Sequence, residues 1–187
     1  GATLDGVTIQ GGNANSTSPN DNGAGMFNNA VSPTVTNVIF SGNSATSKGG
    51  GMYNDNGSDP TVTNVTFSGN VARGGAGLFN NHSYPLLTNV TFSGNTASIR
   101  GGAVLNEGAS PIFRNVTFTG NSAPAGTGGA IRNVVNASGA ASNPQIQNSI
   151  LWGNGGDIEI GEGSLTLTYS LVEGGCPAGA ACDHVLD

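Results

Sequence analysis

Charged side chains are the residues of this sequence that could carry out catalysis, and they are few and scattered. Enzymes that cleave polysaccharides bring carboxylates together on one face, alone or with Arg or Lys. The nearest approach to such a cluster is Asp157 and Glu159, with Arg132 one repeat earlier at the level of Glu159. Exposed charges at such positions usually form surface ion pairs. We therefore expect an ion pair between neighbouring repeats here, no catalytic residues and no enzymatic activity.

The two cysteines lie near the C-terminus, in the segment CPAGAAC. Cys176, Cys182 and His184 could together hold a metal, but their spacing fits no standard zinc site. An even pair of cysteines at short spacing favours a disulfide in an oxidising compartment, with two free thiols as the alternative. We predict a Cys176–Cys182 disulfide, and we expect neither a metal nor a cofactor.

The overall composition limits the partners of the chain. It has 187 residues, of which 32 are Gly, and its five Lys and Arg against eleven Asp and Glu give a net charge of −6. This balance disfavours a nucleic-acid partner, because phosphate binding needs many cationic side chains. No apolar run approaches the length of a membrane span. The chain begins at Gly1 with no visible signal peptide, so we interpret it as a processed mature chain or a piece of a longer protein.

A ten-residue motif occurs four times and sets the repeat. The copies are TVTNVIFSGN (Thr34–Asn43), TVTNVTFSGN (Thr61–Asn70), LLTNVTFSGN (Leu86–Asn95) and IFRNVTFTGN (Ile112–Asn121). Their Phe residues lie 27, 25 and 26 residues apart, and degenerate copies flank them on both sides. Periods of this length are typical of solenoids, whereas propeller blades usually need about 40 residues or more.

Stacking the repeats aligns their apolar residues into columns. One column is Ile9, Phe40, Phe67, Phe92, Phe118, Leu151 and Val172. The residues between the columns are mostly polar, and this alternation predicts strands with one face in a core and one in water. Each repeat is then one coil of an all-β parallel solenoid, within a single domain over residues 1–187. We expect about seven coils, near residues 3–33, 34–60, 61–85, 86–111, 112–144, 145–164 and 165–187.

Two columns of Asn recur at bends of the expected coil. The first is Asn37, Asn64, Asn89, Asn115 and Asn148, and the second is Asn43, Asn70, Asn95, Asn121 and Asn154. Asn tolerates the left-handed backbone of a sharp bend, and its amide both donates and accepts hydrogen bonds. Identical amides stacked about 4.8 Å apart can bond to one another along the axis. We predict that both columns form ladders inside the coil, so we do not interpret the NVT sequons at Asn64, Asn89 and Asn115 as glycosylation sites.

A stripe of outward-facing aromatic residues is expected on three consecutive coils, at Phe27, Tyr53 and Phe79. The stripe could stabilise neighbouring strands beneath a covering loop, or it could offer a platform to a sugar ring or a partner surface. The first interpretation is favoured, because cross-strand aromatic pairs commonly stabilise sheets.

Two of these motifs together resemble the repeat of a known family. The FxxN block (FSGN at Phe40, Phe67 and Phe92; FTGN at Phe118) occurs with GGAV at Gly101 and GGAI at Gly128. This pairing resembles the repeat of chlamydial polymorphic outer membrane proteins. The segments that end in GGGMYN and NSILWGN are similar to right-handed parallel β-helix repeats of bacterial surface proteins of the choice-of-anchor type. The resemblance implies a right-handed single-stranded parallel β-helix, an exported cell-surface setting, and a role in adhesion or envelope structure.

We therefore expect a non-enzymatic extracellular rod. Leu4, Val7 and Ile9 already belong to core columns, and Leu167 and Val172 still do so near the other end. Such ends suit pairing with other copies or with neighbouring β-helix segments, since bare terminal coils expose apolar side chains and strand edges. Surface glycans or a cell-surface protein are further possible partners. Two alternatives remain open: a filament-forming subunit, and a β-helix that binds or cleaves carbohydrate.

Overall fold

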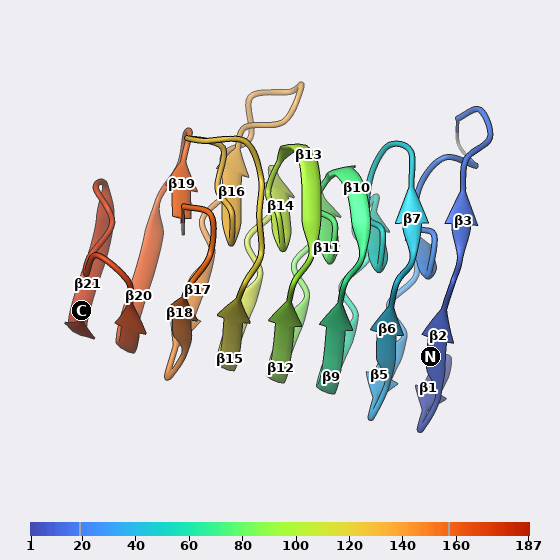
Figure 1. Cartoon of the computed structure of the whole chain (residues 1–187), viewed down its shortest axis with the longest axis horizontal. Helices are drawn as coiled ribbons and strands as arrows, with labels where there is room; N and C mark the ends of the chain where they lie inside the picture. The colour runs from blue at the N-terminus through green and yellow to red at the C-terminus, as the bar shows by residue number, and fades with distance from the viewer. Residues whose placement is uncertain (19, 157) are drawn as a thin grey trace.

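Short β-strands stacked side by side along one axis make up the whole fold (Figure 1). The computed structural model describes residues 1–18, 20–156 and 158–187. Every pairing between the described strands is parallel. In each of the first four coils the chain passes through three sheets in turn and then begins the next coil, which is the arrangement of a parallel β-helix. None of the described residues forms a helix long and apolar enough to cross a membrane.

The largest sheet, called sheet A here, contains the FxxN motif and has eleven strands. Its strands are β1 (Thr3–Asp5), β2 (Thr8–Gln10), β5 (Thr34–Thr36), β6 (Ile39–Ser41), β9 (Thr61–Ser68), β12 (Leu86–Ser93), β15 (Ile112–Thr119), β17 (Gln145–Gln147), β18 (Ile150–Trp152), β20 (Leu165–Val172) and β21 (Ala180–Leu186). In β9, β12 and β15 a single continuous strand forms the rung of sheet A. On three other rungs two short strands take its place: β1 and β2, β5 and β6, and β17 and β18.

The other two sheets have fewer strands than sheet A, with four strands in sheet B and six in sheet C. Sheet B contains β3 (Asn13–Ala14), β7 (Ser44–Ala45), β10 (Val71–Gly74) and β13 (Thr96–Arg100). Sheet C contains β4 (Met26–Asn29), β8 (Met52–Asp55), β11 (Leu78–Asn81), β14 (Val104–Glu107), β16 (Ile131–Val134) and β19 (Ile158–Ile160). Loops protrude from the stack near β3 and near β16 (Figure 1).

Apolar columns from all three sheets meet inside the coil, and the register of the strands is the one that the repeat predicted. Val62, Leu87 and Phe113 are opposite one another, and so are Phe67, Phe92 and Phe118. The rings from Phe40 to Phe118 form a parallel stack with centroids 4.8–5.0 Å apart. All four of these rings are fully buried. The prediction of an all-β parallel β-helix is confirmed.

Strand β21 is a rung that the repeat analysis did not predict. It pairs with β20 over most of its length, so sheet A continues beyond the seven expected rungs. The last expected coil, near residues 165–187, therefore contains two rungs of sheet A, β20 and β21. The segment lacks the Asn and Phe of the motif, but Ala180 and Val185 both pack against the core, because the left-handed residue His184 between them bends the strand as Asn64 does in β9.

Candidate functional site

The second predicted Asn column, from Asn43 to Asn154, forms a ladder inside the coil, and this prediction is confirmed. Asn43, Asn70, Asn95 and Asn121 are fully buried, and Asn154 is partly buried. Each Oδ1 of Asn70, Asn95 and Asn121 accepts two bonds from the preceding Asn, one from its backbone N–H and one from its Nδ2, at 2.9–3.1 Å. Asn121 bonds to Asn154 in the same way. The Nδ2 groups of Asn70, Asn95, Asn121 and Asn154 also donate to the carbonyl of the motif Phe in the preceding coil.

A second buried ladder lies on sheet C and was missed by the sequence analysis. Its members end the GAGMFN-type blocks: Asn28, Asn54, Asn80, Asn106 and Asn133. Each Nδ2 donates to the next Oδ1 at 2.8–3.0 Å. The ladder ends at Asn133, whose Nδ2 has no partner among the described residues, because Ile160 is opposite it on the next rung. The signal was present: Asn28 lies two residues after Met26, so strand alternation places both on the inner face.

The first predicted Asn column lies outside the coil, so its assignment to the interior was wrong. Asn37, Asn64, Asn89, Asn115 and Asn148 are exposed, and their φ angles are 50–55°. Residues three apart in a regular strand face opposite sides. The left-handed residue at Asn64 bends the strand so that Val62 and Val65 both face the core. The amides from Asn37 to Asn115 still form a ladder on the surface, at 3.1–3.2 Å. The burial argument against glycosylation at the three NVT sequons therefore fails.

The aromatic stripe lies on the outer face of sheet C. The Phe27 and Tyr53 rings stack at 5.0 Å, and the Tyr53 and Phe79 rings meet edge to face at 5.1 Å. Phe27 is 40% exposed, but Tyr53 and Phe79 are buried and pack with Leu105. The Lys48 ammonium covers them, 4.6 Å from the centre of the Phe79 ring. Burial, and secondarily the Asp55 carboxylate, raise the pKa of Tyr53 well above its ordinary value. The stripe is therefore mainly a packed layer, as the favoured interpretation had it.

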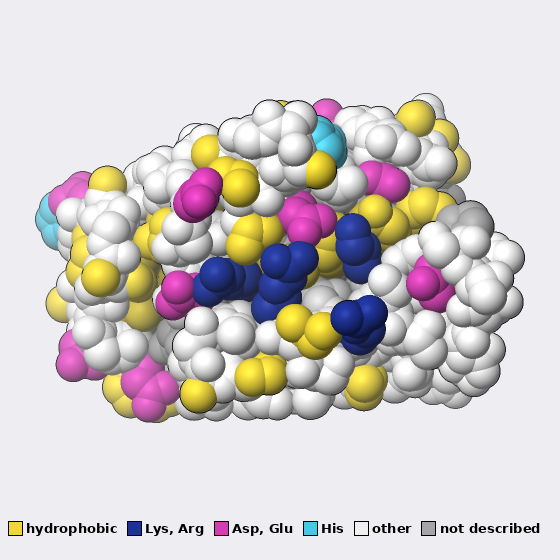
Figure 2. Space-filling view, turned by 90° about the horizontal axis from the view of Figure 1, so that it is seen from above, with side chains coloured by type: hydrophobic (Ala, Val, Ile, Leu, Met, Phe, Trp, Pro, Cys, Tyr) yellow, Lys and Arg dark blue, Asp and Glu magenta, His cyan; other side chains and the backbone are white. Residues whose placement is uncertain are grey.

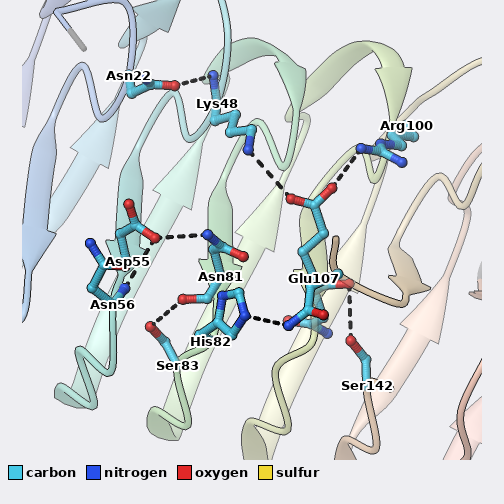
Figure 3. Close-up of polar contacts among 12 residues, drawn as sticks. Asn22, Lys48, Asp55, Asn56, Asn81, His82, Ser83, Arg100, Glu107 and Ser142 are labelled. Atoms are coloured by element: carbon cyan, nitrogen blue, oxygen red, sulfur yellow. Dashed lines mark hydrogen bonds and ion pairs between the residues drawn. The ribbon is translucent and has the colours of Figure 1, made fainter. Parts of the chain in front are cut away.

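A carboxylate bridges two cations above this layer. Glu107 Oε2 lies 3.3 Å from Lys48 Nζ, and its Oε1 accepts a 2.7 Å bond from Arg100 Nη2 (Figure 3). The Glu107 side chain is 16% exposed. Lys48 is opposite Gly74 on the next coil, and Gly74 is opposite Arg100 on the one after. Lys48 and Arg100 therefore lie two coils apart, on either side of Gly74, and the Glu107 carboxylate lies between their cationic groups.

The glycine leaves a hollow between the two cations. A Cβ at Gly74 would lie 2.8 Å from Leu105 Cδ2, so any larger residue here would have to displace the end of the Leu105 side chain that lines the hollow. The hollow has a volume of ≈ 300 Å³, with Lys48, Arg73 and Arg100 around it and Phe79, Ile99 and Leu105 as its apolar lining. Figure 2 shows the Lys and Arg side chains gathered along the middle of this face, with apolar side chains beside them.

A second hollow of ≈ 300 Å³ adjoins the first and shares Arg100 with it. Arg132 lines it from sheet C, together with Val134, Val135 and Glu162. Arg132 Nη1 lies 2.9 Å from Glu159 Oε1, which confirms the predicted ion pair between coils. Asp157, the third member of that predicted group, lies outside the described residues. The two hollows together are called the basic groove below.

The C-terminal rung carries the disulfide. Cys176 and Cys182 are bonded, with their Cα atoms 6.1 Å apart, as predicted. The bridge links the crossover after β20 to β21. Tyr169 and His184 continue the outer Asn column on β20 and β21, with φ of 50° and 53°, and their rings stack at 4.7 Å. Within the described ranges, no group of three or more His, Cys, Asp or Glu side chains could hold a metal ion.

Comparison with protein families matches residues 2–184 to the right handed beta helix region family. Comparisons with curated proteins and with solved structures gave no match. The match covers nearly the whole chain, and the parallel strands, the stacked Phe rings and the Asn ladders are the features of such a coil. The chain therefore belongs to the right-handed β-helix family.

Proposed function

We propose that this chain is a stiff module of an exported protein, which acts as a structural or adhesive rod at the cell surface. The observation that carries the proposal is the continuity of the axial columns. The buried ladder from Asn43 to Asn154 and the Phe stack run through the same central coils. A second buried ladder runs along sheet C from Asn28 to Asn133.

These columns oppose bending and sliding of one coil on the next. A shift between two central coils would break side-chain bonds in two buried ladders together with the backbone bonds of the sheets. Each buried polar group left without a partner costs about 1–3 kcal/mol. Because repeat arrays resist deformation through nearest-neighbour contacts, such coils transmit force along the axis.

The disulfide and the motif resemblance support the export of the module. Disulfides persist in oxidising compartments, outside the cytosol of most cells. The FxxN and GGA[ILV] motifs are similar to repeats of chlamydial polymorphic outer membrane proteins, and the neighbouring segments to surface proteins of the choice-of-anchor type. A cell-surface position would leave the groove and the aromatic edge at Phe27 open to glycans or to a partner protein.

Single-molecule pulling tests the mechanical part of the proposal. The chain would be stretched along its axis between flexible linkers, beside the variant Asn70→Ala with Asn95→Ala. We expect wild type to resist extension in discrete steps, and the double variant to yield at clearly lower force. If wild type extended at a force as low as the force that stretches an unfolded linker, the proposal of a stiff rod would be refuted. Biotinylation of intact source cells with a membrane-impermeant reagent tests the location, and labelling only after lysis would refute export.

The strand edges at the two ends favour a second candidate function, a filament subunit. Within the described residues, β1 pairs only with β5, and β21 pairs only with β20. A free strand edge can accept a further strand, from a neighbouring segment or from another copy. Sedimentation across a dilution series tests this candidate. Growth of the sedimentation coefficient with concentration would support it, and a single monomeric species at all concentrations would refute it.

A further inference from the structure

The outer face of sheet A becomes apolar at its C-terminal end, where β18, β20 and β21 lie side by side (Figure 1). A hollow of ≈ 570 Å³ opens on these strands, and its lining includes Ile150, Tyr169, Leu171, His184 and Leu186, called the C-terminal patch here. We propose that this patch binds a segment of a partner protein that presents apolar side chains flanked by Lys or Arg. The proposal names a partner class for the adhesive role above and rests on that role only for its setting.

The patch departs from the repeat in two neighbouring columns. One column has Thr in the central coils and aliphatic side chains in the last rungs: Thr66, Thr91, Thr117, Ile150, Leu171 and Leu186. The other is the outer Asn column, which continues as Tyr169 and His184. Large apolar and aromatic side chains therefore replace small polar ones on this part of the sheet.

These side chains are open to solvent although they lie next to one another. Ile150, Tyr169 and Leu186 are exposed, and Leu171 is half-buried. The Tyr169 and His184 rings, stacked at 4.7 Å, line the hollow together with the aliphatic column. Contiguous exposed apolar surface of this kind marks interaction sites, whereas single exposed apolar residues are common on any protein.

The charge of the chain is concentrated in the part that carries the patch. All five Lys and Arg and five of the eleven Asp and Glu lie within residues 1–132, so residues 133–187 hold the other six acids and no Lys or Arg. The whole net charge of −6 therefore belongs to this C-terminal part.

Three of these carboxylates border the patch. Glu173, Asp183 and Asp187 are exposed, and Asp183 Oδ1 lies 2.7 Å from His184 Nδ1 within the patch. Arg114 is the one cation among the strands of sheet A, and it lies three rungs from Asp183 in the same column. An apolar centre with an acidic rim is complementary to apolar side chains flanked by cations.

The same charge disfavours other occupants of the patch. Two copies that met at their patches would bring together two ends with six acids each, and like charges facing one another across an interface cost affinity. A nucleic acid or an anionic lipid surface would be repelled for the same reason. A cationic protein segment is the occupant that both the charge and the apolar surface favour.

The single Trp of the chain can report on binding at this place. Trp152 lies two residues after Ile150 on β18, so both project from the same face of the strand, and both are exposed. The probe is a synthetic peptide with a Leu-Thr-Leu centre and a pair of Lys at each end. The parallel probes carry Glu in place of Lys, or Ser in place of Leu. Trp152 fluorescence and calorimetry follow each titration of the full chain.

The chain offers matched variants for the apolar and the charged part of the patch. Ile150→Thr restores the Thr of the central coils, and its control is Ile39→Thr, in the same column at the other end of the sheet. Ile150 is 45% exposed and Ile39 is 44% exposed, so both changes should be tolerated equally. Asp183→Asn removes a charge at the rim, and its control is Asp5→Asn, an exposed acid in the same column.

We expect the Lys peptide to bind saturably, to change Trp152 fluorescence, and to bind more weakly as salt is raised. Ile150→Thr should weaken binding about tenfold, and Asp183→Asn about threefold at low salt, whereas the two controls should leave it unchanged.

Several results would overturn the proposal: no saturable binding, equal losses in a variant and its control, equal affinity for the Glu or Ser peptide, or binding without a change in Trp152 fluorescence. Dimerisation of wild type but not of Ile150→Thr in sedimentation would assign the patch to a second copy and would overturn it too. The pulling and labelling experiments do not depend on these outcomes, so the rod proposal is judged separately.

Discussion

The two asparagine columns of the repeated motif lie in the same coils but stabilise the protein in different ways. Asn95 is fully buried and exchanges bonds with Asn70, with Asn121 and with the Phe67 carbonyl. Asn89, six residues earlier, is exposed, has a φ of 55°, and makes single ladder bonds to its neighbours above and below. The inner column stabilises the coil through the hydrogen bonds of its side chains, whereas the outer column does so through its left-handed backbone conformation.

This difference explains why one residue type serves two positions. Inside, only an amide can accept two N–H groups from the coil before and still donate to a carbonyl and to the coil after. Outside, the requirement is a left-handed residue at a corner, which other residues can also meet. Tyr169 and His184 continue the outer column at φ of 50° and 53°, without any amide.

The largest effect is expected for Asn95→Ala in the inner ladder. Its removal leaves the backbone N–H and the Nδ2 of Asn70, as well as the Phe67 carbonyl, without their partners in a buried place. At about 1–3 kcal/mol for each such group, with partial relaxation, we expect a loss of about 3–5 kcal/mol in the free energy of unfolding. Urea denaturation measures it, with exposed Ser98→Ala on the same coil as control. A loss no larger than that of the control would contradict the ladder's role.

The sheet C ladder should be weaker at its end than in its middle. Asn80→Ala leaves Asn54 Nδ2 and Asn106 Oδ1 without partners, so we expect a loss of about 2–4 kcal/mol. Asn133→Ala leaves only the Nδ2 of Asn106 without its acceptor, and it removes an Nδ2 donor that already lacks an acceptor among the described residues, so a loss of about 1–2 kcal/mol is expected. Denaturation midpoints of the two variants, compared side by side, check this gradient. Equal losses of unfolding free energy in Asn80→Ala and Asn133→Ala would contradict the expected gradient along the ladder.

The disulfide should protect only the terminal rung. Replacing both cysteines, by Cys176→Ser and Cys182→Ser, removes the constraint on a short loop, worth about 2 kcal/mol in the chain-entropy account. Because β21 lies at one end of sheet A, we expect faster hydrogen exchange of its amides and unchanged exchange in β9, β12 and β15. Exchange that accelerates equally throughout the chain would mean that the end and the centre unfold as one unit.

The smallest effect is expected for Asn89→Ala in the outer column. The variant gives up two solvent-exposed ladder bonds and places Ala in a left-handed conformation, which costs about 1–2 kcal/mol for an ordinary residue and less for Asn. We expect a loss of about 1 kcal/mol in the free energy of unfolding by urea denaturation. A loss as large as that of Asn95→Ala would contradict the exposed position of this column.

Much of the fold followed from the period and the alternation of the sequence, and the errors have physical causes. The Phe column, the inner Asn43 column and the disulfide were predictable, because each repeats a residue type at one spacing or in one segment. Asn64 was misplaced because a left-handed residue changes which side chains face inward, and alternation counted straight through the bend cannot show this. The sheet C ladder could have been found by counting two residues on from Met26.

The basic groove could not be predicted in the same way. Lys48, Arg100 and Glu107 belong to different columns of the repeat, and Gly74 creates the hollow between them by having no side chain. Their proximity depends on how the corner between sheets B and C is packed, and a list of columns does not contain that information. The Arg132–Glu159 pair, in contrast, was predictable because both residues occupy one column on adjacent coils.

Glycine substitution in both columns tests the central distinction most directly. Glycine adopts a left-handed backbone without strain, but it supplies no amide and weakens a regular strand by about 0.5–1 kcal/mol. We predict that Asn89→Gly leaves the free energy of unfolding within about 0.5 kcal/mol of wild type, whereas Asn95→Gly costs at least as much as Asn95→Ala, about 3–5 kcal/mol. Equal losses for the two glycine variants in the same urea series would contradict the assignment of one column to side-chain bonding and the other to backbone geometry.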